Sequence, residues 1–171
     1  LKAGTTDVLP GLPATSRHLY LDRALEIDPG FALARARKAN AYALSLVDNM
    51  ISGLGSRDVP RDTRLAYQYA REALALEPDL TEAHTALARL NQYTWRWHAA
   101  RENYRDAYGR DPDNVDLLRL YSHFASYTGA HSLAQQMAER ALELSPETSS
   151  LQFRRGTVAL NERDLAGAVA A

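Results

Sequence analysis

Hydrophobic and polar positions recur along the chain in one short phrase, with alanine and leucine at helical spacing and a proline at its end. The phrase reads Arg-Ala-Leu-Glu-Ile-Asp-Pro at 23–29 and returns, with changes, at 72–78, 106–112 and 140–146. Alanine and leucine favour helices, and their spacing gives each helix one apolar face. Proline lacks the amide hydrogen and clashes with the preceding turn, so each phrase predicts the end of a helix.

The prolines that close these phrases set the length of a repeat. They are Pro29, Pro78, Pro112 and Pro146, so their separations are 49, 34 and 34 residues. Equal spacings of this size indicate a repeated unit of secondary structure, and the first spacing is one such period with 15 residues inserted. We therefore expect an all-α chain built of antiparallel helical hairpins.

Anchoring the repeat on the prolines divides the chain into units within a single domain, 1–171. The expected units are a partial hairpin at about 1–31, a hairpin at 32–80 with an insertion at about 48–61, hairpins at 81–114 and 115–148, and a truncated hairpin at 149–171. Because the chain begins with Leu1 and breaks off inside the last hairpin, we expect it to be a fragment of a longer protein.

The insertion falls in the hairpin that starts near Ala32. Its first helix is predicted from Phe31 to about Ile51, followed by a break at two glycines and a second helix that starts near Val59. Asp58 or Asp62 would cap that second helix. The insertion is either a lid or docking loop, or a longer helix pair with a surface loop, and we favour the second interpretation.

These features resemble the tetratricopeptide repeat (TPR) family over residues 16–171. A narrower resemblance links the segments at 60–62, 77–87 and 93–97 (Tyr-Thr-Trp-Arg-Trp) to the TPR regions that follow bacterial winged-helix transcriptional regulators and adenylate cyclases. The family resemblance implies a right-handed α-solenoid of about four to five repeats, and the narrower one implies a signalling or transcription-regulatory parent protein. Arg35 and Lys38 depart from the family pattern, since large apolar residues are usual at their positions.

In this family the first helices of the hairpins line a concave groove, and the resemblance assigns groove positions here. The residues so assigned are Arg37, Asn40, Arg89, Gln92, Tyr93, Arg119, His123, Tyr127, Phe153 and Arg154. Arginine matches carboxylates and tyrosine offers rigid contact area, so we predict a protein scaffold whose groove binds an acidic peptide, a partner protein or another domain of the parent chain. The alternatives are a groove that is merely solvated, and a self-association module that forms a homodimer.

Composition excludes several other classes of function. The chain has no cysteine, and 20 basic residues balance 21 acidic ones to a net charge of -1. Thiolate metal sites, disulfides and cysteine nucleophiles are excluded, and bulk attraction to nucleic acid is not expected. We find no catalytic constellation and no apolar run long enough for a membrane helix, so we expect no enzyme activity, no cofactor and no membrane insertion. We expect a cytoplasmic location and leave a periplasmic one open.

Two further groups have a functional and a structural interpretation. Trp95 and Trp97 flank Arg96 at a predicted turn between helices, where they form either an exposed binding site or repeat packing. We favour packing for Trp97 and leave Trp95 open. His98 and Glu102 are four residues apart on one helix, but no third metal ligand has a recognisable spacing, so we expect an ordinary surface pair.

Overall fold

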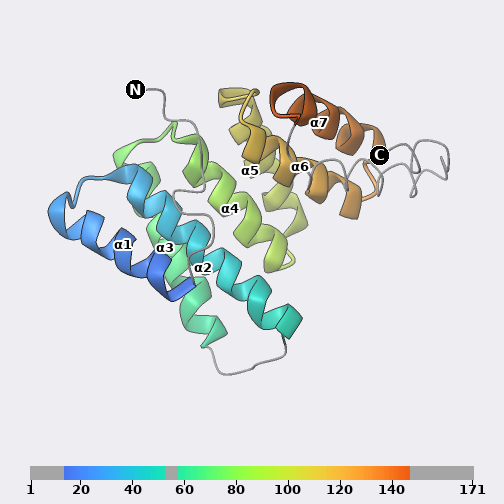
Figure 1. Ribbon diagram of the computed structural model, residues 1–171. Coiled ribbons are helices and arrows are strands. Elements are labelled where there is room, and N and C mark those ends of the chain that lie inside the picture. Colours follow the sequence, from blue (N-terminus) through green and yellow to red (C-terminus); the bar gives the residue numbers. More distant parts are fainter. Residues whose placement is uncertain (1–13, 53–57, 147–171) are drawn as a thin grey trace. The chain divides into compact units, whose positions relative to one another are not determined.

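The computed structural model describes residues 14–52 and 58–146, and all of their regular secondary structure is helical (Figure 1). The helices are α1 (Ala14–Ile27), α2 (Ala32–Ser52), α3 (Val59–Leu76), α4 (Thr81–Tyr93), α5 (Trp97–Arg110), α6 (Val115–Tyr127) and α7 (His131–Leu144). The prediction of an all-α chain of helical hairpins is confirmed. The expected last hairpin at 149–171 and the two glycines of the insertion lie outside the described residues.

Local sequence explains where several helices begin. Asp58 caps α3, since its carboxylate accepts a hydrogen bond from the Arg61 amide at 3.0 Å. Pro60 stands in the first turn, where a missing amide hydrogen costs nothing. Asn114 caps α6 in the same way through the Leu117 amide at 3.1 Å. Of the two caps considered for α3, the structure confirms Asp58.

The chain divides into two compact units, Leu1–Ala107 and Tyr108–Ala171. In the first unit α2 packs against α1, α3 and α4. Buried residues, all alanine except Leu90, form three layers across α2, α3 and α4: Ala36 with Ala73 and Ala83, Ala39 with Ala70 and Ala86, and Ala43 with Ala66 and Leu90. Side chains of this size let the helix backbones approach closely, and the larger neighbours fill the remaining volume.

The second unit contains the hairpin of α6 and α7, which pack against each other. Ala125 and Ala134 form its small-residue contact. The Ser122 hydroxyl, which is buried, donates a hydrogen bond to the Ala134 carbonyl at 2.8 Å. This bond ties the middle of α6 to the first turn of α7, so the hairpin is held by a polar contact as well as by packing.

The two residues that depart from the apolar pattern of α2 are held by charges on other helices. Lys38 is 4% exposed, forms an ion pair with Asp22 of α1, and lies 4.6 Å from the centre of the Tyr69 ring. Arg35 pairs with Glu72 of α3 at 3.2 Å. A buried ammonium needs such compensation, and the two pairs connect α2 with α1 and with α3.

Candidate functional site

The predicted groove residues of the first unit meet where α2 lies against α4. Arg89 of α4 is 6% exposed, and its guanidinium donates a hydrogen bond to the Asn40 side-chain oxygen of α2 at 2.6 Å. The same guanidinium lies 5.9 Å from the centre of the Tyr93 ring, one turn further along α4. Three of the residues assigned to the groove from the sequence are therefore in contact.

Arg37 adds a second guanidinium to this face, because it precedes Asn40 by one turn of α2. It is half-buried, and its Nε atom is buried with no hydrogen-bond partner. The Nε of Arg89 is also buried and unpaired. Within residues 14–52 and 58–146, neither arginine has a carboxylate partner.

A cluster of this composition is suited to an anion. A buried charge is costly unless it is paired, and among the described residues the hydrogen-bond partner of Arg89 is the amide of Asn40, which is neutral. Guanidinium groups present several N–H donors in a plane and match a carboxylate with two parallel hydrogen bonds. We call Arg37, Asn40, Arg89 and Tyr93 the α2–α4 cluster.

Gln92, also assigned to the groove, is engaged elsewhere. It is 7% exposed, and its side-chain oxygen accepts a hydrogen bond from the hydroxyl of Tyr104 at 3.0 Å. Tyr104 is fully buried, and the adjacent Asn91 bonds Asn103 at 2.8 Å. Gln92 thus helps to fasten α4 to α5, which sequence spacing did not indicate.

The predicted groove residues of the second unit lie on α6. Arg119 is half-buried and its guanidinium is 3.9 Å from the carboxylate of Asp116, one turn earlier. His123 and Tyr127 stack edge to face with ring centres 4.4 Å apart, and Tyr127 is 70% exposed. Phe153 and Arg154 lie outside the described residues. A groove that joins these positions to the α2–α4 cluster remains a prediction.

The turn between α4 and α5 contains a feature that sequence analysis only partly identified. Trp95 has a φ of 62°, in the left-handed region, and is 68% exposed. Its ring lies edge to face with that of Trp97, with centres 5.4 Å apart, and Trp97 is 36% exposed. Trp95 is therefore exposed, and the packing expected for Trp97 is incomplete.

Two contacts between an arginine and an aromatic ring beside this turn were not predicted from the sequence. The guanidiniums of Arg71 and Arg96 lie 5.9 and 5.8 Å from the centre of the Tyr67 ring. Tyr67 and Arg71 are four residues apart on α3, so their proximity could have been read from helical spacing. The contact with Arg96 joins distant parts of the sequence and gave no local signal.

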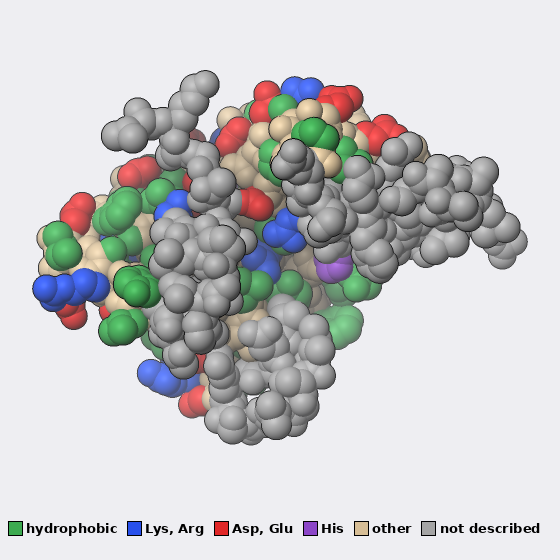
Figure 2. All heavy atoms as spheres, viewed as in Figure 1, with side chains coloured by type: hydrophobic (Ala, Val, Ile, Leu, Met, Phe, Trp, Pro, Cys, Tyr) green, Lys and Arg blue, Asp and Glu red, His purple; other side chains and the backbone are tan. Residues whose placement is uncertain are grey.

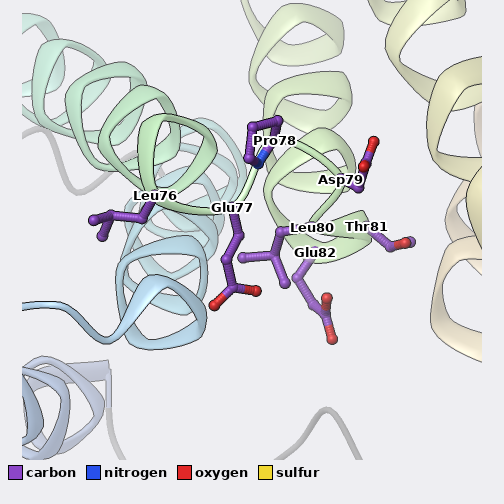
Figure 3. Close-up of a pocket in the computed structure, with 7 residues that line it drawn as sticks. All are labelled: Leu76, Glu77, Pro78, Asp79, Leu80, Thr81 and Glu82. Carbon is purple, nitrogen blue, oxygen red and sulfur yellow. The ribbon is translucent and has the colours of Figure 1, made fainter.

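The connection between α3 and α4 borders an open hollow of about 510 Å³, lined by residues 76–82. Figure 3 shows Glu77 and Glu82 directed to the same side of this connection, with Leu80 between them. The predicted groove residues are not among its lining residues.

In the part of the chain that the structure describes, no three His, Asp or Glu side chains are grouped as metal ligands, and no helix is long and apolar enough to span a membrane.

Comparison with known proteins shows which solved structures share this fold. No protein-family model and no curated protein matches the sequence. Among solved structures, the chain is similar to PilF of Pseudomonas aeruginosa, at 28% identity and a TM-score of 0.61 over 78% of this chain. The match spans 58% of that protein's chain, so this chain corresponds to little more than half of it.

Two further structures share the fold at lower identity. MamA matches at 17% identity and a TM-score of 0.61, over 88% of this chain and 79% of its own. YrrB, a TPR protein with an unusual peptide-binding site, matches at 19% identity and a TM-score of 0.60, over 88% of this chain and 70% of its own. Since all three neighbours are TPR proteins, the helical hairpins of this chain have the tetratricopeptide-repeat fold.

Proposed function

We propose that the chain is a protein-interaction scaffold that binds an acidic peptide, or an acidic segment of a partner domain, through the α2–α4 cluster. The observation that carries this proposal is the environment of Arg89. Its side chain is only 6% exposed, and its hydrogen-bond partner is a neutral amide. A carboxylate from a ligand would supply the missing counter-charge.

The geometry of the cluster supports this assignment. Asn40 fixes the position of the Arg89 guanidinium in advance, so less conformational freedom is lost when a ligand binds. Arg37 lies one turn away with an unpaired Nε, and Tyr93 offers an aromatic surface beside Arg89. Arginine and tyrosine are also the residue types that contribute most to binding at protein interfaces.

The remaining groove positions extend the proposed binding surface. Arg119, His123 and Tyr127 of α6, and Phe153 and Arg154 outside the described residues, are included on the family resemblance alone. Peptide binding by YrrB supports the general function, because YrrB shares the fold. A signalling or transcription-regulatory parent protein rests on the sequence resemblance alone.

Isothermal titration calorimetry can test the proposal with a defined probe. A synthetic peptide of alternating glutamate and alanine should bind the wild-type chain, and the counterpart with glutamine in place of glutamate should bind about tenfold more weakly or not at all. Arg89→Met, which keeps the volume of the side chain and removes its charge, should reduce affinity for the glutamate peptide to a similar extent.

Arg105→Met is the matched control, because Arg105 is an exposed arginine on α5. This variant should bind the glutamate peptide as the wild type does. Equal affinity of the glutamate and glutamine peptides, or equal affinity of Arg89→Met and the wild type, would overturn the proposal. Circular dichroism of each variant establishes that its helices are intact before binding is compared.

Self-association is the second candidate, and one observation favours it. Apolar side chains are exposed on and beside α1: Leu19 at 69%, Tyr20 at 57%, Ile27 at 75% and Phe31 at 41%. Figure 2 shows hydrophobic side chains at the surface over α1, at the left of the view. Contiguous exposed apolar surface is typical of interaction sites. Sedimentation velocity over a range of concentrations should reveal a dimer that Ile27→Asp abolishes, and a monomer at every concentration would exclude this candidate.

A further inference from the structure

The surface around the α4–α5 turn combines features that ordinary solvation does not explain. Tyr67 and Arg71 come from α3, and Trp95, Arg96 and Trp97 come from the turn and the start of α5. We call these five residues the aromatic–arginine surface. All of them belong to the first unit, and Trp95 and both arginines are exposed.

Trp95 occupies a backbone conformation that a glycine would adopt more easily. The turn after α4 closes with hydrogen bonds from Trp95 N to Gln92 O at 3.2 Å and from Arg96 N to Asn91 O at 2.8 Å. The turn after α6, 34 residues later, repeats this pattern with Gly129 in the place of Trp95, at a φ of 77°. A side chain in the left-handed region is strained, and such strain is concentrated at functional sites.

The aromatic pair is also costly to leave in water. Trp95 and Trp97 present two rings at 87° to each other, and Trp95 is largely exposed. The repeat itself shows that the fold does not need a tryptophan here, since Gly129 closes the equivalent turn. Neither backbone geometry nor burial accounts for Trp95, so its side chain is available for a partner.

Arg71 and Arg96 give this surface its charge. Both guanidiniums lie within 6 Å of the centre of the Tyr67 ring, whose hydroxyl is fixed by Asn91 at 2.7 Å and by Thr94 at 3.1 Å. Over the described ranges 14–52 and 58–146, neither arginine forms an ion pair. Two like charges around one ring repel each other, and an anion between or beside them would stabilise both.

This surface is separate from the α2–α4 cluster. Arg89 faces α2 through Asn40, whereas Asn91 faces α3 through the Tyr67 hydroxyl. Two residues along a helix are rotated by about 200°, so the two contacts lie on nearly opposite sides of α4. A ligand in the α2–α4 cluster therefore does not cover Trp95 or Arg96.

We infer that the aromatic–arginine surface docks a second protein segment, one that carries an acidic residue next to an apolar side chain. The apolar side chain would pack on Trp95 and Trp97, and the carboxylate would pair with Arg71 and Arg96. Tryptophan, tyrosine and arginine are the residues enriched at binding hot spots, and this surface consists of them alone. The inference is independent of the function proposed for the α2–α4 cluster.

A protein segment fits this surface better than a nucleic acid. Stacking aromatics and arginines can bind single strands, but such sites use an extended basic groove along the backbone. Here the chain has a net charge of -1, and the exposed side chains of α5 mix both signs, with Glu102 and Asp106 directly after Arg101 and Arg105. A phosphate backbone that continued along α5 would therefore meet alternating charges and no continuous basic groove.

The full 171-residue chain can be tested with a displayed library of random linear peptides. Wild-type selections should enrich peptides that place an aspartate or glutamate beside an aromatic or large aliphatic residue. Synthetic copies of the enriched peptides should bind Trp95→Gly and Arg71→Glu/Arg96→Glu about tenfold more weakly or worse, measured by fluorescence anisotropy. Trp95→Gly suits the backbone of the turn, so lost binding in this variant does not arise from lost folding.

Two controls make the outcomes unambiguous. Arg105→Met removes an exposed arginine of α5 that belongs to neither site, and it should leave the affinity of these peptides unchanged. In an Arg37→Met/Arg89→Met background, where the α2–α4 cluster is neutralised, Trp95→Gly should still lower the affinity by the same factor. Enrichment of peptides without acidic residues, or undiminished binding to Trp95→Gly, would overturn the inference. Tighter binding of a labelled single-stranded oligonucleotide than of any enriched peptide, at the same ionic strength, would also overturn it.

Discussion

The left-handed conformation of Trp95 leads to a quantitative prediction about two substitutions at one position. Trp95→Ala keeps a β-carbon at a φ of 62°, whereas Trp95→Gly removes it. Both variants lose the edge-to-face contact with Trp97, which is worth about 0.5–1.5 kcal/mol. The difference between them therefore reports the backbone alone.

The magnitude follows from the conformational preferences of the two residues. A residue with a β-carbon in the left-handed helical region costs roughly 1–2 kcal/mol. Glycine avoids this cost but gains more freedom in the unfolded chain, an opposing effect of about 0.4–1 kcal/mol. We expect Trp95→Gly to be more stable than Trp95→Ala by about 1 kcal/mol, and close to the wild type in stability.

Urea denaturation followed by far-UV circular dichroism measures this difference without relying on tryptophan fluorescence. With a slope of about 2 kcal/mol per molar urea, the two midpoints should differ by about 0.5 M. Gly129→Ala provides the internal control, since Gly129 closes the equivalent turn with a φ of 77°. It should lower the free energy of unfolding of its hairpin by about 1 kcal/mol.

The outcomes separate two errors in the reasoning. If Trp95→Ala is as stable as Trp95→Gly while Gly129→Ala loses stability, Trp95 is not left-handed in solution. If Gly129→Ala loses nothing either, these turns do not require a positive φ, and the backbone is strained at neither position.

Three other predictions concern stability and protonation. Asp22→Ala should destabilise the chain by about 3 kcal/mol, because it leaves the buried ammonium of Lys38 unpaired. Lys38→Met should cost less than about 1.5 kcal/mol in the same urea assay. The cost is smaller because the Asp22 side chain left behind is 50% exposed, so water can solvate its charge. Asp58→Ala should cost about 1 kcal/mol through loss of the α3 cap, and an unchanged urea midpoint would contradict the cap. Burial, with Tyr69 adding to it, raises the pKa of Tyr42 above its ordinary value of 10.0. The folded state thus holds this proton more tightly, so the contribution to stability is complete below pH 10.0 and is lost as the pH rises through the folded pKa. Subtracting the phenolate absorbance of Tyr42→Phe from that of the wild type gives the titration of Tyr42 alone, and its midpoint should lie above pH 10.0. A midpoint at or below pH 10.0 would contradict the burial of Tyr42.

Much of the local structure could be predicted from the sequence. The first helix of the inserted hairpin was expected at about 31–51 and is observed at Ala32–Ser52. Asp58 was one of two expected caps for α3, and the positive φ after α6 falls on Gly129, the residue type that adopts it most readily. These features depend on residues close in sequence, through helix propensity, capping and turn geometry, so the local sequence contains the necessary information.

The candidate sites were accessible to sequence reasoning only in part. Family spacing placed Arg37, Asn40, Arg89 and Tyr93 on one surface, and the structure brings Asn40, Arg89 and Tyr93 into contact. Spacing did not show that Arg89 is buried with no counter-charge among residues 14–52 and 58–146. That property depends on the residues of α2 that face α4, which no pattern along α4 alone reveals.

The sequence by itself determined the helical hairpins, their period and most of the points where helices begin and end, because these follow from interactions within a few residues. Only the tertiary structure decided which charges were compensated. It supplied Asp22 for Lys38 and Glu72 for Arg35, and it left Arg89 with a neutral amide. Charge pairing between helices depends on the positions of side chains far apart in the chain, and the same repeat pattern is compatible with a paired arginine or an unpaired one.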